Sequence, residues 1–551
     1  MPVINFNFND LVGLMGKDLP SSVVLERIPM IGADLHEFDA VTGETSIEFF
    51  PNRPDLYSVE GVARALRAFM DIKPGLRVYP TNDSGIVMKV EDSVNDVRPY
   101  VVAAVIKNVV MTDQIIRSLM ELQEKLHLTV GRKRVKVAIG VHDLDKVTPP
   151  FVYKGAEPDS ISFVPLAKEE PMTMREVLEK HEKGVAYKSI LEGKPLYPVI
   201  LDANGDVLSF PPIINGRLTT VTCDTKNIFI DVTGMDYVTI SGVLNIVTTS
   251  IAERGGDVET VTITRGRKKD VTPKLVPGVW KIDIAAANKW LGLDLDADGM
   301  AKCLARMGYS ADGTGKKLNV HSSAVRMDLI HPHDVIEDIA IGYGYENFGK
   351  VLPRTQTVGS ERPIERAADL VRQLMVGYGF WEATTLTLTS KEDQFMHMRV
   401  HEQEVVEVLN PVSEDHTCLR IRLMPSLLAV LRKSKHRDLP QRIFEVGDVV
   451  DGKRRKNLAV MAIHSKAGFT EMKSVVEGVM RDLSVKFDLE PLESGMYISG
   501  RGASVLVNGK CVGSFGELHP EVITVFELGY PVIAFEVNLD VLVEGKVGKI
   551  F

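Results

Sequence analysis

Cysteines and long apolar runs are both scarce in this sequence. The four cysteines, Cys223, Cys303, Cys418 and Cys511, form no Cys-x-x-Cys pair, which argues against a zinc ribbon and against a disulfide framework. Isolated thiols are typical of reduced cytosolic proteins. No stretch approaches the roughly 20 apolar residues of a membrane helix, and the first ten residues do not resemble a signal peptide. We therefore expect a cytoplasmic protein with no membrane partner.

Several catalytic motifs are also missing. The sequence contains no Walker-type phosphate loop, no Gly-x-Ser-x-Gly elbow and no His-Glu-x-x-His. Gly342 and Gly344 lack the third glycine of a dinucleotide fingerprint. These absences argue against a nucleotide-triphosphate site, an activated serine and a zinc-bound water in this chain.

Positive charge is not in excess either. The net charge is −9, with 44% apolar and 25% charged residues, which is ordinary for globular protein. An acidic chain binds nucleic acid only through local basic patches. Four such patches are present, and each taken singly is more typical of a solvated surface: 132–136, 265–269, 432–437 and 453–456.

The length of 551 residues predicts roughly three to five domains, and the pattern of apolar residues predicts a multidomain α+β protein. We expect four parts. They are an N-terminal α+β domain (1–90), a mixed α/β domain (91–262), a winged-helix-like module (270–350) and a mainly antiparallel sheet domain (355–551).

Local signals set the elements within these parts. In the first, residues 3–8 alternate as a strand does, Asn9 or Asp10 offers an N-cap, and Ser58 caps a helix that continues to residue 71. The charged segment 265–270 is interpreted as a linker. In the last part, the predicted strands include 383–388, 405–409, 442–450 and 457–465.

A group of carboxylates gathers near residue 330. Pro332 favours a helix start, so Asp334, Glu337 and Asp338 share one helical face, and Asp328 ends the segment before it. Without an interleaved lysine these groups repel one another unless a hard cation lies among them, and oxygen ligands suit Mg²⁺. The alternative is that Asp334 is an N-cap and Glu337 completes a capping box.

Polar residues follow predicted strands in the second part. His142 lies after the strand at 135–141, and Asp231 and Thr233 end the strand at 227–233. Ser209 and Asn215 flank the Pro211-Pro212 turn. Strand ends beside tight turns are places where a hydrolytic pocket can form, although capping or turn bonding explains each residue taken alone.

Taken in order, these segments resemble the beta subunit of phenylalanyl-tRNA synthetase. The chain's length, without the N-terminal extension of bacterial beta chains, favours the archaeal/eukaryotic type. The matching segments are Asn52-Arg-Pro-Asp-Leu56, His142-Asp-Leu-Asp145, Phe163-Val-Pro-Leu166, Pro211-Pro-Ile-Ile-Asn215, Asp231-Val-Thr-Gly234, Arg326-Met-Asp328 with Asp334-Val-Ile-Glu-Asp338, Tyr343-Gly-Tyr345 and Phe444-Glu-Val-Gly447.

The resemblance implies a role for each part. Residues 91–262 would be an editing domain that hydrolyses mischarged tyrosyl-tRNA(Phe), and 355–551 a class II synthetase-like domain without catalysis. Two alpha and two beta chains would assemble, and the alpha subunit would activate phenylalanine with ATP and bind tRNA(Phe) together with this chain. The family's magnesium site would be Asp328, Asp334, Glu337 and Asp338. The candidate editing residues are Asp231 and Thr233, then Ser209, Asn215 and His142.

Physical reasoning favours an editing role, because a pocket shaped for phenylalanine rejects tyrosine only by a factor on the order of 10² or less. Two other interpretations stay open at this point. The chain could be a tRNA-binding assembly scaffold with an inactive editing site, or a free-standing deacylase.

Overall fold

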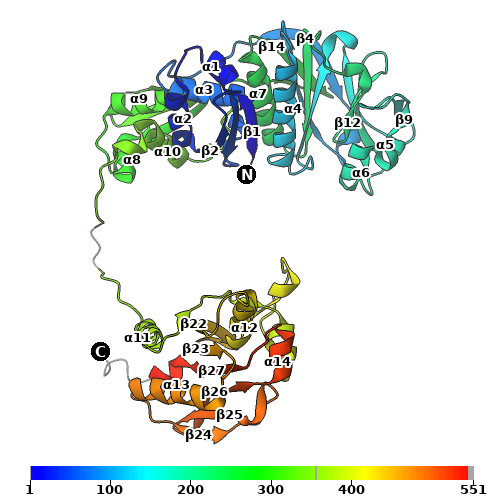
Figure 1. Ribbon diagram of the computed structural model, residues 1–551. Coiled ribbons are helices and arrows are strands. Elements are labelled where there is room, and N and C mark those ends of the chain that lie inside the picture. Colours follow the sequence, from blue (N-terminus) through cyan, green and yellow to red (C-terminus); the bar gives the residue numbers. More distant parts are fainter. Residues whose placement is uncertain (1, 314, 354–356, 544–551) are drawn as a thin grey trace. The chain divides into compact units, whose positions relative to one another are not determined.

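The computed structural model describes residues 2–313, 315–353 and 357–543. The chain divides into two compact units, Met1–Val351 and Leu352–Phe551 (Figure 1). Among the described residues, no helix combines the length and the apolar character needed to cross a bilayer.

Unit 1 begins with a small sheet packed on helices. Strands β1 (Val3–Asn7), β3 (Glu44–Phe49) and β2 (Ala33–Phe38) are hydrogen-bonded in that order. Helices α1 (Phe8–Met15), α2 (Ser21–Arg27) and α3 (Val59–Phe69) complete this region. Ser58 caps α3 by accepting a hydrogen bond from the Gly61 N–H, as predicted. The cap predicted at Asn9 or Asp10 is wrong, because the Asn7 side chain accepts from the Asn9 N–H and starts α1 earlier.

The largest element of unit 1 is a ten-stranded sheet with the order β12-β11-β10-β7-β4-β14-β5-β13-β6, in which β15 also pairs with β14. The strands are β4 (Asn82–Val90), β5 (Tyr100–Lys107), β6 (Val137–Asp143), β7 (Phe151–Ala156), β10 (Tyr197–Leu201), β11 (Val207–Phe210), β12 (Ile214–Asn215), β13 (Ile228–Gly234), β14 (Asp257–Arg265) and β15 (Lys268–Thr272).

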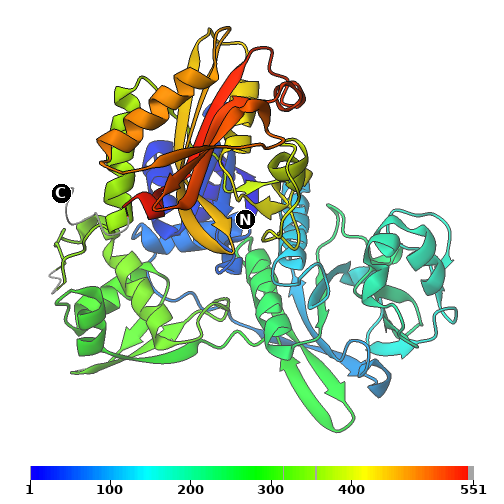
Figure 2. The same cartoon turned by 90° about the horizontal axis from the view of Figure 1, so that it is seen from below.

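Two predictions disagree with this sheet: the domain boundary at residue 91 and the linker at 265–270. Strand β4 lies before residue 91 but pairs in parallel with both β7 and β14. The segment 265–270 is not a linker, because it forms the tip of the β14–β15 hairpin, which extends as a two-stranded arm (Figure 2). For β4 the pairing with strands distant in sequence decided the structure, whereas 265–270 closes a local hairpin that its charge and glycine content do not reveal.

Helices α4 (Asp113–Leu128) and α7 (Tyr237–Ala252) contact each other beside the sheet (Figure 1). Their apolar residues share one core with the N-terminal sheet. Polar contacts also join the two regions: the hydroxyls of Ser58 and Ser250 are 3.3 Å apart, and Arg254 is hydrogen-bonded to Asp10 and Glu60. The N-terminal region and the large sheet therefore pack as one body.

The last part of unit 1 has a three-stranded sheet with the order β16-β18-β17, made of β16 (Gly278–Asp283), β17 (Ser310–Asp312) and β18 (Lys317–Ser322). Helices α8 (Ile284–Leu291), α9 (Ala297–Arg306) and α10 (Pro332–Tyr343) surround it. The predicted helices at 284–290 and 297–307 and the strand at 317–320 are confirmed. The winged-helix label stays a prediction.

Unit 2 is built on a seven-stranded sheet with the order β19-β22-β23-β27-β26-β25-β24. All its pairs are antiparallel except β19–β22, so the predicted sheet type is confirmed. The elements are β19 (Trp381–Glu382), β22 (Gln441–Asp451), β23 (Lys453–Ile463), β24 (Asp488–Pro491), β25 (Tyr497–Val507), β26 (Lys510–Leu518), β27 (Val532–Asn538), α11 (Pro363–Gly377), α12 (Met424–Lys433), α13 (Phe469–Asp482) and α14 (Pro520–Val525).

Two strands predicted in unit 2 are wrong. Residues 383–387 contain no strand, and β20 (Leu388–Thr389) covers only the end of the predicted segment. Residues 405–409 form a single bridge, between Glu407 and Cys418. Both segments are rich in β-branched residues but find no long partner strand, so composition alone does not produce a ladder.

Candidate functional site

A cavity of about 260 Å³ lies in unit 1, at the large sheet. Four of the five predicted editing residues line it: Ser209, Asn215, Asp231 and Thr233. They come from β11, β12 and β13, which belong to opposite ends of the sheet order. The structure therefore brings together residues that the sequence analysis placed at separate strand ends.

The fifth predicted residue, His142, supports Asp231 from outside the cavity lining. Its Nε2 is 2.8 Å from Asp231 Oδ2, and its Nδ1 is 2.8 Å from Thr219 Oγ1. The Thr219 hydroxyl is farther from the carbonyl oxygens of Gly216, at 3.3 Å, and Leu208, at 3.5 Å. Because a carboxylate can only accept, His142 Nε2–H donates to Asp231 whichever way the Thr219 hydroxyl points.

This chain holds Asp231 as a hydrogen-bond acceptor. The carboxylate is 1% exposed and His142 is fully buried. Oδ2 is bonded to the imidazole, and Oδ1 has no bond to another described side chain. Glycine at position 140 makes room for the pair, because a Cβ there would lie 2.0 Å from Asp231 Oδ2. Asp231 can therefore accept a hydrogen bond from a hydroxyl group of a molecule in the cavity.

Thr233 is held by a buried guanidinium. Arg98 Nε donates to Thr233 Oγ1 at 2.9 Å, and Arg98 Nη2 donates to the Thr233 carbonyl oxygen at 2.7 Å. Burial lowers the pKa of Arg98 to about 10. Because the Thr233 hydroxyl accepts from Arg98, its own proton is available to a ligand in the cavity.

Three side chains of the cavity wall have buried groups without a hydrogen bond to any described residue: Ser209 Oγ, His127 Nδ1 and Arg134 Nε. His127 Nδ1 lies 3.8 Å from Glu124 Oε1, which is beyond hydrogen-bond distance. His127 Nε2 accepts from the Ile139 N–H at 2.8 Å, which places the proton on Nδ1. Burial lowers the pKa of His127, so the ring stays neutral and offers one donor.

Apart from the predicted editing residues, the sequence analysis noted only Arg134 among the charged residues of the wall, as part of the basic patch 132–136. Glu124 and His127 lie on α4, Arg134 follows that helix, and Lys183 comes from α6 (Glu182–Tyr187). Arg134 Nη2 is 2.6 Å from Glu124 Oε1. The contact with the His127 ring, together with Arg134 and Lys183, lowers the pKa of Glu124 to about 2. The only local signal was the i, i+3 spacing of Glu124 and His127 on an otherwise amphipathic helix.

The four carboxylates near residue 330 do not gather as a metal site. Arg326 Nη2 lies 2.7 Å from both Asp328 Oδ2 and Asp338 Oδ2. Asp334 Oδ2 accepts from the N–H groups of Ile330 and His331, each at 2.7 Å. Arg326, two residues before Asp328, thus neutralises two of the four carboxylates without a metal ion, and the magnesium site itself stays a prediction.

A magnesium ion bound by all four carboxylates does not fit this arrangement. Glu337 is exposed, whereas Asp338 is buried and also accepts from the Tyr309 hydroxyl. The alternative is wrong as well, because His331 is the N-cap and Asp334 is the N3 residue of the capping box, whose carboxylate accepts from the His331 N–H. Among the described residues, the one group with metal-ligand spacing is Asp34, His36 and Glu48 on β2 and β3.

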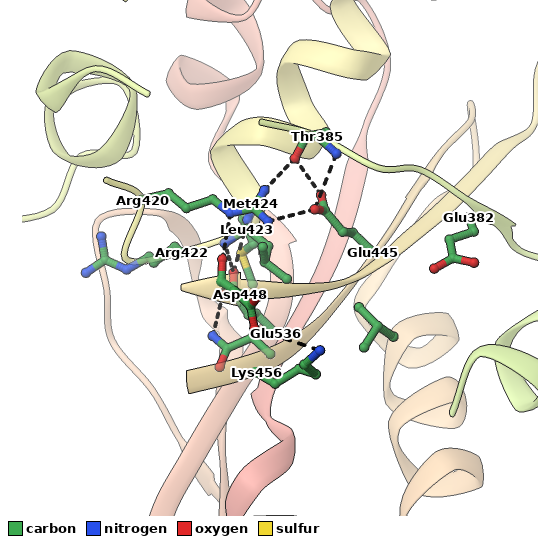
Figure 3. Close-up of polar contacts among 12 residues, drawn as sticks. Glu382, Thr385, Arg420, Arg422, Leu423, Met424, Glu445, Asp448, Lys456 and Glu536 are labelled. Carbon is green, nitrogen blue, oxygen red and sulfur yellow. Dashed lines mark hydrogen bonds and ion pairs between the residues drawn. The ribbon is translucent and has the colours of Figure 1, made fainter. Parts of the chain in front are cut away.

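Unit 2 has a polar centre of its own (Figure 3). Glu445 accepts from Arg420 at 2.8 Å and from the Thr385 hydroxyl at 2.6 Å. Glu536 accepts from two backbone N–H groups at the start of α12 and from Asn457, and burial raises its pKa. These carboxylates are satisfied within the protein, so they stabilise the fold without a ligand.

Comparisons with known proteins agree with this division. Residues 98–264 match the B3/4 domain, residues 280–345 the tRNA synthetase B5 domain, and residues 349–539 the phenylalanyl tRNA synthetase beta chain CLM domain. These matches define the chain as part of an aminoacyl-tRNA synthetase.

Relatives over the full length narrow this class. The phenylalanine–tRNA ligase beta subunit of Methanothrix thermoacetophila is 45% identical, over 98% of this chain and 100% of the relative. That of Archaeoglobus fulgidus is 44% identical, over 98% of both. A solved N-terminal fragment of the Pyrococcus horikoshii phenylalanyl-tRNA synthetase beta subunit is 35% identical with a TM-score of 0.61, covering 62% of this chain and all of the fragment. The chain belongs to the phenylalanine–tRNA ligase beta-subunit family.

Proposed function

We propose that this chain works with an alpha subunit to attach phenylalanine to tRNA(Phe), in an assembly of two alpha and two beta chains. The alpha subunit uses the ATP. Unit 2 serves as a class II synthetase-like domain without catalysis. The internal bonding of Glu445 and Glu536 supports this assignment, because neither carboxylate is free to bind a substrate.

We further propose that the cavity at the large sheet hydrolyses mischarged tyrosyl-tRNA(Phe). The observation that carries this proposal is the buried carboxylate of Asp231, fixed by His142 in the cavity wall. A phenolic hydroxyl would donate to the second oxygen of Asp231, whereas a phenylalanyl ester would leave that oxygen without a donor from the ligand. Sites built around such a bond reject the analogue that lacks it by about 10⁴–10⁵. Tyrosyl esters are therefore the preferred substrate.

The remaining polar groups suit the hydrolysis itself. A water oxygen bonds to the ester carbonyl carbon, the bond to the ribose oxygen breaks, and the ribose oxygen takes the proton. Thr233 and Ser209 offer hydroxyls within the cavity, where they can orient the attacking water or the carbonyl oxygen. Asn215 helps to close the cavity between β12 and β6.

The test is deacylation of tyrosyl-tRNA(Phe) by the assembled complex. The double variant Asp231→Ala with Thr233→Ala is expected to lose hydrolysis while it still aminoacylates with phenylalanine. Asp145→Ala is the matched control, because Asp145 lies just past β6, outside the cavity lining, and is bonded to Asn227 at the surface. Unchanged hydrolysis in the double variant would remove both residues from the site.

A second candidate function is an assembly scaffold with an inactive editing site. The same assay separates the two functions, because the wild-type complex of a pure scaffold would not deacylate tyrosyl-tRNA. The unpartnered Ser209 and His127 groups favour an active cavity, since buried polar atoms without partners are uncommon unless a ligand uses them.

A further inference from the structure

A second cavity in unit 1, of about 90 Å³, is lined by an unusual number of cationic side chains. It lies where residues 53–77 meet residues 307–326, and it includes part of the Asn52–Leu56 segment, for which the proposed function has no use. The cationic residues are Arg53, Arg64, Arg67, Lys73, Arg77 and Arg326.

Carboxylates neutralise only some of these cations. Arg53 forms a two-point bond with Asp55, at 2.8 and 2.9 Å, and Arg326 pairs with Asp328 and Asp338. Arg67 and Arg77 share one carboxylate, that of Glu253, at 2.9 and 3.8 Å. Four carboxylates therefore face six cations, which leaves an excess of two positive charges.

Two of the cations have no carboxylate partner, and a third has a donor that is not used. Arg64 donates only to neutral oxygens, those of the Tyr79 hydroxyl, the Thr249 hydroxyl and the Asp55 carbonyl, each at 3.3 Å. Lys73, at the exposed rim, forms no ion pair with any described residue. Arg326 Nη1 is buried without an acceptor, and the Arg326 side chain is only 6% exposed.

Confining unbalanced charge in a partly buried site is costly, because each guanidinium or ammonium gives up hydration. An anion with several oxygens would neutralise the excess and accept from the unused donors, and guanidinium groups match phosphate geometry well. The cavity equals roughly three water volumes, which suits one phosphate group and excludes a nucleoside.

We propose that the cavity lined by Arg53, Arg64, Arg67, Lys73, Arg77 and Arg326 binds a phosphate group. The group comes either from a tRNA backbone or from free phosphate. By binding a backbone phosphate, this chain of net charge −9 would gain a local contact with RNA. That source rests on the proposed function, whereas phosphate binding itself does not.

The test uses the full chain and inorganic phosphate as probe, with chloride at equal ionic strength as reference. Lys73→Gln with Arg77→Gln removes two rim cations that are exposed, so the fold should survive. The matched control is Lys289→Gln with Lys302→Gln, two exposed lysines of α8 and α9 with the same charge change. Titration calorimetry should show saturable binding, weakened about tenfold or more in the rim variant only.

A second arm measures tRNA affinity against salt concentration. If the phosphate belongs to tRNA, the rim variant should bind tRNA more weakly and lower the salt slope by about one per lost contact. Weaker phosphate binding with unchanged tRNA binding would support the cavity and assign it to free phosphate.

Absence of saturable phosphate binding by the wild type, or equal affinity in the rim variant, would overturn the proposal. The proposal would also fail if the rim variant bound phosphate and tRNA as the wild type does but no longer bound the alpha subunit. The cavity would then receive an acidic side chain of that partner. None of these results depends on tyrosyl-tRNA hydrolysis, so the two proposals can fail separately.

Discussion

The side-chain amide of Asn215 donates to the carbonyl oxygen of Val141 at 3.4 Å. Asn215 belongs to β12 and Val141 to β6, the first and last strands in the order of the large sheet. This bond links the two ends of the sheet beside the cavity, which explains why residues from β11, β12 and β13 line one space. A pocket of this kind depends on the curvature of the whole sheet and not on one loop.

Gly140→Ala should abolish most of the deacylation activity of the cavity although it replaces no polar side chain. A Cβ at this position would lie 2.0 Å from Asp231 Oδ2 and 2.6 Å from His142 Nε2, so the pair must move. Misplacement of about 1 Å can cost roughly 100-fold in rate, and we expect a loss of that order in tyrosyl-tRNA deacylation. Phenylalanine attachment should be unchanged. Gly13→Ala, where a Cβ meets nothing within 4 Å, is the control.

Thr219→Val tests whether His142 positions Asp231. The change keeps the shape of the side chain but removes the oxygen 2.8 Å from His142 Nδ1. A buried imidazole nitrogen left unpaired should cost about 1–3 kcal/mol and lower the deacylation rate. Thr524→Val is the control, since this exposed threonine of α14 lies in unit 2 and its hydroxyl donates to the carbonyl oxygen of Pro520. Equal rates in both variants would show that the Thr219 bond does not position Asp231.

Arg326→Met should destabilise unit 1 strongly. It leaves Asp328 and Asp338 partly or fully buried without their cation, and removing one partner of a buried pair costs roughly 3–5 kcal/mol. Urea denaturation at neutral pH measures the change. The exposed pair of Arg27 with Glu346 gives the comparison, because Arg27→Met should cost about 1 kcal/mol or less.

Metal removal gives a separate prediction. Because Arg326 supplies the positive charge beside Asp328 and Asp338, treatment of the isolated chain with EDTA should leave its melting temperature unchanged. A fall of several degrees, abolished by Asp334→Asn with Glu337→Gln, would instead support the magnesium site that the family resemblance implies.

Asp55 should make stability depend on pH in the acid range. Burial would raise the pKa of this carboxyl, but Arg53, with Arg326 and Arg64 nearby, holds it at about 2, below roughly 3.9 in an unfolded chain. The stabilisation is therefore present above about pH 4 and is lost as the pH falls towards 2. It amounts to roughly 2 kcal/mol, and Asp55→Asn should remove it.

Melting temperatures between pH 7 and pH 3 check this expectation. Asp55→Asn should be less stable than the wild type at pH 7, and the gap should narrow towards pH 3. The exposed Asp298 on α9 provides a matched Asp→Asn control, which should follow the wild type throughout. A constant gap at every pH would contradict the linkage.

The sequence was sufficient for β6 and β13 but did not predict β11 and β12, the strands that carry Ser209 and Asn215. Asp231 and Thr233 are two residues apart on an apolar strand, so a common face follows from the period of two. Their partners could not be predicted in the same way. Thr219 lies 77 residues from His142, and Arg98 lies 135 residues from Thr233, so only the folded sheet reveals these contacts.

The basic patches show the same limit in another form. The sequence analysis found runs of adjacent cations, whereas the phosphate-sized cavity collects arginines from residues 53, 64, 67, 77 and 326. Arg326 was within the carboxylate segment but was not weighed as its counter-ion. Charge neutralisation depends on the distances between charged groups in the folded chain. Spacing along a helix predicts only the distances between residues of that helix.

Strand β4 has a consequence for how these parts can be separated. It precedes the segment that matches the B3/4 domain, yet it lies between β7 and β14 in the sheet. A fragment cut at residue 98 would open a gap in the middle of the sheet and expose two unpaired edges, which favour aggregation. A fragment that is to keep the cavity must therefore begin at about residue 80. It would also need a new cover for the face of α7 that packs on the N-terminal core.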